Sequence, residues 1–355
     1  MAKISVILAN LGTPEVPTSQ AVSQYLGEFL SDPRVVDVSQ PKWGIILRII
    51  RFFRAPKVAK IYQSVWTEQG SPLLSISNQQ RDQLQATLSK QFPQHEWTVV
   101  LGMTYGQPSL KEVTTQVFNH EPEHVIVLPL YPQFSSTTVL PVIDAFNRGY
   151  ADKNQRFVPP FSIVNNYHLD ASYIKALVHS IKAHIAKQEN LTLEQVEPAK
   201  YFSATNKLFL SYHGIPTRYA QELADPYPQQ CETTTQAVVH ALGLNAEQYQ
   251  MTYQSVFGKE PWLVPQTDQT LTSYAQANPG ASAMVICPGF AADCIETLEE
   301  IDEANRELFL HHGGKNYSMV PCLNASPEHL EMMVSLLQPY IALVEAQNSN
   351  QYKIN

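Results

Sequence analysis

The chain is a succession of short apolar runs, rich in β-branched residues, that each end in a turn containing Gly or Pro. Helix-like periodic stretches lie between these runs, for example at 79–88 and 110–118. Strands that alternate with helices predict a parallel sheet covered by helices on both faces. The runs predicted to be strands are 4–9, 97–101, 124–130, 161–164, 207–210, 251–253, 283–287 and 318–320.

The last four runs repeat the order of the first four, and the turns after them are similar. The sequence Asn-Leu-Gly-Thr-Pro at 10–14 corresponds to Tyr-His-Gly-Ile-Pro at 212–216, and Tyr-Pro-Gln-Phe at 131–134 to Cys-Pro-Gly-Phe at 287–290. This internal repeat predicts two similar α/β domains with a ligand cleft between them, at the carboxyl ends of their strands. The alternative is that any two α/β halves look alike at this level.

The domains expected from the repeat are 1–168 and 169–355, with the C-terminal helix packing back on the first domain. Gly12 and Gly106 are 94 residues apart, whereas Gly214 and Gly258 are 44 apart. The first domain therefore carries an insertion of about 50 residues between its first two strands.

Composition restricts the classes of function. The net charge of −8 argues against nucleic acid as the main partner, because no basic excess is present to meet phosphates. The four cysteines contain no C-x-x-C pair, which argues against structural zinc and favours a reducing compartment. The first apolar run is too short for a signal peptide, and no run reaches the roughly 18 residues of a membrane span. A cytoplasmic location is expected.

His213 lies where a buried run meets the Gly-Ile-Pro turn, at the predicted cleft. A neutral imidazole at such a position can accept protons or bind a metal ion. The alternative is a histidine whose ring only bonds to the backbone at a strand end.

A predicted helix follows the Cys-Pro-Gly-Phe turn and is rich in acidic residues. With the spacing of an α-helix, five of them lie on one stripe, namely Asp293, Glu296, Glu300, Glu303 and Glu307. A carboxylate stripe that leads from a cleft can conduct a divalent cation or export protons. On spacing alone a capping box is favoured instead, because acidic residues stabilise the N-terminus of a helix.

The segment 43–54 is very apolar and carries an arginine at every third position, namely Arg48, Arg51 and Arg54. A basic amphipathic segment can close over an apolar ligand or lie on a membrane surface, and its arginines can pair with carboxylates. The alternative is a core helix whose arginines extend to solvent.

Six ordered segments together resemble the ferrochelatase family, in its Gram-negative bacterial type. They are 10–14, 70–73, 128–135, 210–216, 254–263 and 287–300, and the resemblance covers nearly the whole chain. It implies two Rossmann-like, chelatase-type domains and a lyase activity. The reaction implied is insertion of Fe(II) into protoporphyrin IX to form protohaem, with release of two protons, in the last step of haem biosynthesis.

The resemblance also implies roles for particular residues. His213 and Glu296 match the catalytic residues, and with Glu300 they are the expected metal-binding residues. Segment 43–54 matches an apolar lip over the porphyrin, inside an insertion at about 15–95, and its arginines are candidates for the propionates. The residues expected in the porphyrin pocket are Leu11, Ser71, Tyr131, Trp262, Arg48 and Arg51.

Several positions depart from other family members. Cys294 stands where many have His, Leu11 where some have a Tyr that contacts the metal, and Thr104 where others have Arg. No cysteine follows Cys322, so no iron–sulfur cluster is expected, and Fe(II) is a substrate rather than a prosthetic group.

Two alternatives to this function remain. One is a related cobalt or sirohydrochlorin chelatase, whose tetrapyrrole is more acidic, and the apolar lip argues against it. The other is a non-catalytic haem- or porphyrin-binding protein. Apart from the two substrates, we expect a monomer or weak homo-oligomer, with peripheral membrane contact through 43–54.

Overall fold

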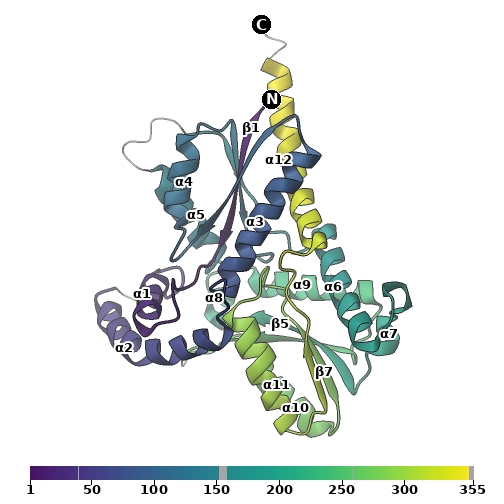
Figure 1. Ribbon diagram of the computed structural model, residues 1–355. Coiled ribbons are helices and arrows are strands. Elements are labelled where there is room, and N and C mark those ends of the chain that lie inside the picture. The colour runs from purple at the N-terminus through teal and green to yellow at the C-terminus, as the bar shows by residue number, and fades with distance from the viewer. Residues whose placement is uncertain (39, 152–157, 259, 352–355) are drawn as a thin grey trace. The chain divides into compact units, whose positions relative to one another are not determined.

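The computed structural model describes residues 1–38, 40–151, 158–258 and 260–351. Lys259, within the fifth family segment, and the tail 352–355 lie outside these residues. The chain divides into two compact units, which are described separately (Figure 1). The first comprises Met1–Tyr131, Ser135–Asn166 and Ala325–Asn355, and the second comprises Pro132–Phe134 and Tyr167–Asn324.

The first unit contains a parallel four-stranded sheet of order β2-β1-β3-β4. Its strands are β1 (Lys3–Asn10), β2 (Glu96–Met103), β3 (His124–Pro129) and β4 (Phe161–Ile163). Its helices are α1 (Ser19–Leu30), α2 (Gln40–Val65), α3 (Pro72–Gln91), α4 (Leu110–Asn119), α5 (Val139–Tyr150) and α12 (Pro327–Gln351). In Figure 1, α4 and α5 cover one face of this sheet, and α3 and α12 cover the other.

Alternation along β1 explains the two layers, because successive side chains of a strand point to opposite faces. Ile7 and Ala9 pack with α4 and α5 in one apolar cluster. Helix α12 contacts α3. Gln94 and His95, which follow the end of α3, each form a 3.0 Å hydrogen bond with the carboxylate of Glu345 in α12. The last helix of the chain is therefore part of the first unit.

The second unit repeats this plan with the order β6-β5-β7-β8, again all parallel. Its strands are β5 (Asn206–His213), β6 (Tyr249–Gln254), β7 (Ser282–Ile286) and β8 (Asn316–Met319). Its helices are α6 (Ala171–Glu189), η1 (Leu193–Gln195), α7 (Pro198–Tyr201), α8 (Thr217–Gln221), α9 (Tyr227–Leu242), α10 (Thr267–Ala277), η2 (Glu296–Ala304) and α11 (Asn305–His311).

The α/β class and the parallel sheets predicted from the sequence are confirmed, and each of the eight predicted runs overlaps one strand. The matching strand orders also support the internal repeat. The insertion in the first unit corresponds to α1 and α2, which stand between β1 and α3.

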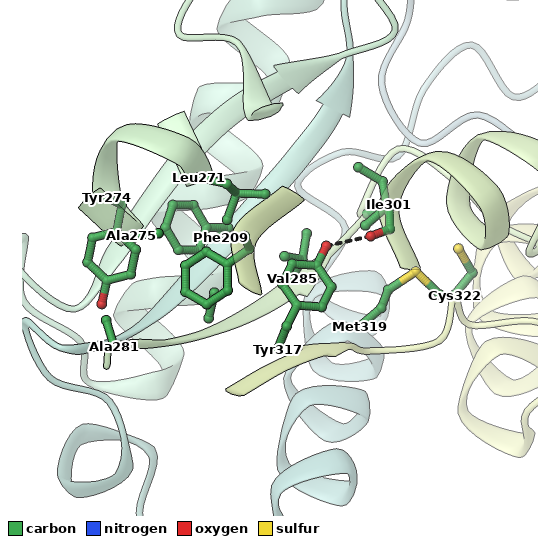
Figure 2. Close-up of a cluster of buried hydrophobic side chains, with 13 residues drawn as sticks. Phe209, Leu271, Tyr274, Ala275, Ala281, Val285, Ile301, Tyr317, Met319 and Cys322 are labelled. Carbon is green, nitrogen blue, oxygen red and sulfur yellow. Dashed lines mark hydrogen bonds between the residues drawn. The ribbon is translucent and has the colours of Figure 1, made fainter. Parts of the chain in front are cut away.

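A buried cluster fixes the helices η2 and α11 to the second sheet (Figure 2). Phe309 of α11 contacts Tyr274 of α10 and Tyr317 of β8, with ring centroids 6.2 and 5.9 Å apart. Ile301 of η2 belongs to the same cluster. Burial of these large side chains is the main favourable contribution to holding α11, and hence the end of η2, in place.

Helix α2 has a packed face and an exposed face. Trp43 and Leu47 are buried, and the Trp43 indole N–H donates to the Leu30 carbonyl at the end of α1, at 2.6 Å. Ile45, Ile49 and Phe52 point to the surface. Within the described ranges, no helix is long and apolar enough to span a bilayer.

The cluster around Phe309 can be tested through stability. We expect Phe309→Ala to lower the free energy of unfolding of the second unit by about 3–5 kcal/mol, because it leaves a cavity among α10, α11 and β8. The neighbouring Leu310 is 42% exposed, so Leu310→Ala is expected to change it by less than about 0.5 kcal/mol. Urea titrations of both variants measure the difference, and equal midpoints would contradict this account of the core.

Candidate active site

Three consecutive connections of the second unit begin at the same edge of its sheet. His213 is the last residue of β5 and pairs with Gln254, the last residue of β6. The chain leaving β7 forms the Cys287–Phe290 turn and reaches Glu296 at the start of η2. Because parallel strands carry their carboxyl ends to one edge, residues from these three connections lie close together.

The ring of His213 is oriented by its own backbone neighbour. Its Nδ1 lies 2.7 Å from the carbonyl oxygen of Gly214. A carbonyl oxygen only accepts, so Nδ1 carries a proton and donates it. In the neutral ring, Nε2 is then left with the lone pair that can accept a proton or bind a cation.

Gln254 is buried and joins His213's strand to the helix that carries Glu296. Its side-chain oxygen accepts a hydrogen bond from the Ser211 hydroxyl at 2.8 Å. Its side-chain nitrogen donates to the backbone carbonyl of Glu296 at 2.9 Å. The first residue of η2 is therefore held in position from β6.

The helix η2 is a π-helix, with backbone bonds from residue i+5 to residue i, and the N–H of Asn305 accordingly donates to the carbonyl of Glu300. Such bonding gives about 4.4 residues per turn rather than 3.6. In an ideal helix of this kind, Glu296 and Glu300 fall on one side, whereas Glu303 falls roughly 150° away from Glu296 around the axis.

The prediction that the acidic residues form a single stripe is therefore wrong, because it assumed α-helical spacing and this segment is a π-helix. Glu303 is exposed, and its charge is felt by Glu299. Burial first, and then Glu303, raise the pKa of the Glu299 carboxyl. The acidic residues thus form two pairs, Glu296 with Glu300 and Glu299 with Glu303.

Ser255 holds the carboxylate of Glu300 with two hydrogen bonds. Its backbone N–H donates to one oxygen at 2.7 Å, and its hydroxyl donates to the other at 2.5 Å. Ser255 has a φ of +63°, in the left-handed region that non-glycine residues rarely adopt. Such strain persists where the surroundings demand it, here because both donors reach the same carboxylate.

Glu300 lies within electrostatic reach of both predicted catalytic residues. Burial raises the pKa of its carboxyl above the usual range, and the charge of Glu296 adds to this rise. The Ser255 hydrogen bonds and the charge of His213 lower that pKa in opposition. His213, Glu296 and Glu300 therefore form one electrostatic cluster.

Cys294 lies beside this cluster as a protonated thiol. Burial raises the pKa of the Cys294 thiol, and the charge of Glu296, to which the thiol donates, raises it further.

The Asp293 carboxylate is used structurally, and it does not form the capping box that the spacing favours. It accepts from the Asn324 amide at 2.6 Å, from the Thr297 hydroxyl at 3.1 Å and from the Cys322 N–H at 3.2 Å. These bonds fix the segment before η2 to the chain that follows β8.

Trp262 lies against the turn that follows His213. An added Cβ at Gly214 would lie 2.9 Å from the backbone oxygen of Gln254 and 3.2 Å from the Trp262 ring, so glycine suits this close approach. The Leu263 N–H also donates to the Ile215 carbonyl at 3.0 Å. The indole N–H of Trp262 is buried without a hydrogen-bond partner among the described residues.

The remaining predicted pocket residues belong to the first unit. Leu11 and Tyr131 are half-buried, directly after β1 and just beyond β3. Ser71 is buried before α3 and accepts from the Thr13 hydroxyl at 2.9 Å. Leu11, Ser71 and Tyr131 thus lie near strand or helix ends.

The two predicted arginines differ in their surroundings. Arg48 is exposed on α2. Arg51 donates to the Ser23 hydroxyl of α1 at 3.2 Å, and its guanidinium lies 2.8 Å from where a Cβ of Gly27 would stand. Arg51 therefore contributes to the packing of α2 on α1.

The metal ligands stay a prediction. In the part of the chain that the structure describes, no three His, Cys, Asp or Glu side chains are arranged as a metal site. The four cysteines are buried free thiols.

Sequence reasoning did not assign roles to Gln254, Ser255, Arg306 or Tyr317. Gln254 and Ser255 stand at the carboxyl end of β6, next to His213. Ligands bind at the carboxyl ends of parallel strands, so this position could have indicated both residues. Arg306 and Tyr317 hydrogen-bond to carbonyls of η2, and no local signal marks them.

The chain is similar to known proteins over nearly its whole length. The family model described as Ferrochelatase matches residues 3–340. The chain is 49% identical to a ferrochelatase of Shigella sonnei (strain Ss046) and 48% identical to one of Escherichia coli (strain K12). Each alignment spans 339 residues, which is 95% of this chain and 98% of the relative.

Solved structures show the fold at much lower identity. The structure of SirB from Bacillus subtilis with Fe3+ has a TM-score of 0.55 and 10% identity, over 97% of this chain and 98% of that one. A multi-domain protein of Deinococcus radiodurans with structural similarity to chelatases has a TM-score of 0.50 and 13% identity, over 95% of this chain and 55% of that one. The two parallel sheets are thus of the chelatase type, and the chain belongs to the ferrochelatase family.

Proposed function

We propose that this protein inserts Fe(II) into protoporphyrin IX to form protohaem, with release of two protons, as the terminal step of haem biosynthesis. The observation that carries this proposal is the cluster of His213, Glu296 and Glu300 at one sheet edge, in a chain that aligns with ferrochelatases over 95% of its length. Fe(II) is a substrate in this reaction, and the absence of an iron–sulfur cluster stays a prediction.

His213 is proposed as the base that accepts pyrrole protons. Metallation requires two N–H protons to leave the macrocycle, and a neutral imidazole accepts protons near neutral pH. The Nδ1–H bond to Gly214 supports this role, because it leaves Nε2 as the accepting nitrogen.

Glu296 and Glu300 are proposed to bind the metal cation and to stabilise the positive charge of the departing protons. His213 is proposed as a further ligand of the metal. Carboxylate oxygens bind hard or borderline divalent cations without the retention that thiolates give. The hydrogen bonds from Ser255 keep the Glu300 oxygens in a fixed orientation. A substrate ion must be released to the porphyrin, so loose binding suits this role.

The porphyrin is proposed to contact Leu11, Ser71 and Tyr131 of the first unit and Trp262 of the second. A flat indole suits a conjugated macrocycle, and binding energy spent on distorting that macrocycle would lower the barrier to metallation. Arg48 and Arg51 are proposed to bind the porphyrin propionates. This role is better supported for Arg48 than for Arg51, because Arg48 is exposed.

Purified protein mixed anaerobically with protoporphyrin IX and Fe(II) or Zn(II) tests the proposed function through the absorbance spectrum. Catalysed appearance of the metalloporphyrin is expected. Faster turnover of Co(II) with sirohydrochlorin would favour the related chelatase. Stoichiometric haem binding without turnover would favour a binding protein.

Replacing His213 tests the proposed base. We expect His213→Ala to lower kcat by at least about 100-fold, because the proton acceptor is lost. Porphyrin affinity, measured by fluorescence quenching, is expected to stay close to that of the unchanged protein. His240→Ala, at an exposed position of α9, is the matched control. Near-normal turnover of His213→Ala would rule out this assignment.

Replacing the carboxylates separates the two acidic pairs. Glu296→Gln is expected to lower kcat by at least about 100-fold, with less effect on porphyrin affinity. Glu303→Gln is expected to lower kcat much less, because the π-helix directs Glu303 away from Glu296. Steady-state rates with Zn(II) measure both variants, with the exposed Glu247→Gln as a surface control. Equal losses for Glu296→Gln and Glu303→Gln would contradict this pairing.

We further propose a cytoplasmic location with peripheral membrane contact through segment 43–54. Phe52 and Phe53 of α2 are 75% and 65% exposed, beside the exposed Arg48 and Arg54. An apolar surface with neighbouring basic residues favours the interface of an anionic membrane.

Vesicle sedimentation tests this contact. We expect binding to anionic vesicles that weakens by about tenfold in Phe52→Asp/Phe53→Asp, since two apolar side chains become charged. Leu343→Asp, at an exposed position of α12, is the matched control. Equal binding of all three proteins would argue against a membrane role for this segment.

A further inference from the structure

The π-helix η2 is longer than most helices of its kind. It spans the nine residues Glu296–Ala304, whereas π-helical segments are mostly single turns within α-helices. An extended π-register is unfavourable on its own, so contacts from outside the helix must stabilise it.

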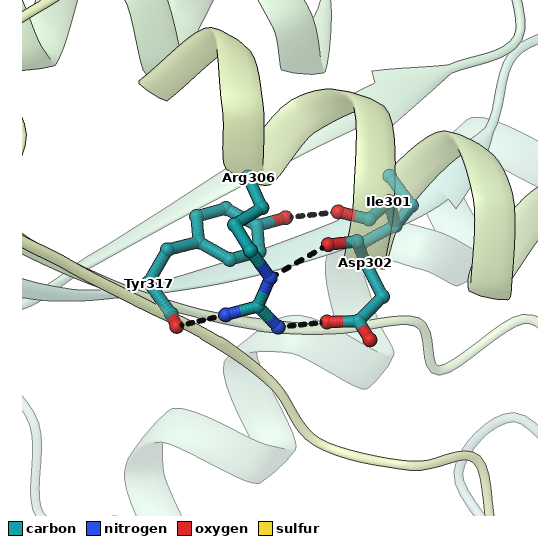
Figure 3. Close-up of polar contacts among 4 residues, drawn as sticks. All are labelled: Ile301, Asp302, Arg306 and Tyr317. Atoms are coloured by element: carbon teal, nitrogen blue, oxygen red, sulfur yellow. Dashed lines mark hydrogen bonds and ion pairs between the residues drawn. The ribbon is translucent and has the colours of Figure 1, made fainter. Parts of the chain in front are cut away.

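Two carbonyls near the end of η2 receive side-chain hydrogen bonds (Figure 3). The Tyr317 hydroxyl donates to the carbonyl of Ile301 at 2.5 Å, and Nε of Arg306 donates to the carbonyl of Asp302 at 2.9 Å. The same guanidinium forms an ion pair with the Asp302 carboxylate. Both donors thus act on neighbouring peptide groups of the π-helix.

Arg306 and Tyr317 also hold each other in place. A terminal nitrogen of Arg306 donates to the backbone carbonyl of Tyr317 at 2.7 Å, and the guanidinium lies 5.2 Å from the centre of the Tyr317 ring. The Tyr317 ring is buried in the core cluster shown in Figure 2. Tyr317 of β8 and Arg306 of α11 therefore present a fixed pair of donors to η2.

The register of η2 decides where its carboxylates point. Suppose η2 became an α-helix while α11 stayed packed through Phe309. Glu300 would then turn by roughly 90° about the axis, and Glu296 by roughly 160°. The bonds from Ser255 to Glu300 and from Gln254 to Glu296 would be lost in that state.

We propose that Tyr317 and Arg306 are positioning residues, which stabilise the π-register of η2 and so keep Glu296 and Glu300 beside His213. This inference rests on the proposed function for its effect on catalysis, but its effect on the helix is independent of that function. Gln254 acts on the first residue of η2, and the Tyr317–Arg306 pair acts near its end.

The core offers a matched control for Tyr317. Tyr274 belongs to the same buried cluster, and its hydroxyl also donates to a backbone carbonyl, that of Ala204, at 3.0 Å. That acceptor lies outside η2. Tyr317→Phe and Tyr274→Phe therefore each remove one hydroxyl from one core, but only the first removes a bond to the π-helix.

The test combines hydrogen–deuterium exchange of peptides covering 296–305 with steady-state kinetics and thermal unfolding. Tyr317→Phe is expected to exchange faster in these peptides and to lose kcat by about fivefold to tenfold, with unchanged porphyrin affinity. Tyr274→Phe is expected to lower Tm by a similar amount without either effect. Arg306→Lys keeps the charge but not the fork of donors, and it is expected to resemble Tyr317→Phe.

Unchanged exchange over 296–305 in both Tyr317→Phe and Arg306→Lys would overturn the inference. Equal losses of kcat in Tyr317→Phe and Tyr274→Phe would overturn it too, because they would indicate a general stability effect. If the unchanged protein fails to metallate porphyrin, the proposed function fails, while the exchange data still decide whether Tyr317 and Arg306 stabilise the π-register.

Discussion

The i+5 to i bonding of η2 is the constraint on which the candidate site depends. It places Glu296 and Glu300 on one side of the helix and turns Glu303 away. Contacts from three strands support this register: Gln254 of β6 bonds to the Glu296 carbonyl, Tyr317 of β8 bonds to the Ile301 carbonyl, and Ser211 of β5 bonds to Gln254. The helix and the sheet thus form one structural unit, and a change in either is expected to move the carboxylates.

The parallel sheet supplies the other half of the site. Because β5, β6 and β7 run in the same direction, their ends bring His213, the Gln254–Ser255 pair and the turn before Glu296 to one edge. Ser255 has a left-handed backbone conformation, and its backbone N–H and its hydroxyl both donate to the Glu300 carboxylate. Local strain at this point is offset by two hydrogen bonds to a carboxylate, which are stronger than bonds between neutral groups.

The strands could be predicted from sequence because period and turn chemistry are local properties, whereas their order within each sheet depends on pairing between distant segments. His213 could be placed for the same reason, since it ends an apolar run before Gly214. The type of η2 could not be predicted, because the residues of a π-helix follow no distinctive pattern, and one of its supporting donors, Tyr317, lies 16 residues after Ile301. The packing of Arg51 on α1 was missed because its signal is the small residue Gly27, which belongs to another helix.

The most direct test of this account is an anomalous-difference map from a crystal soaked with Co(II), a divalent cation that stands in for Fe(II). A peak bounded by His213, Glu296 and Glu300 is expected, because the π-helical bonding of η2 brings these residues together. A peak between Glu299 and Glu303, with none beside His213, would contradict it.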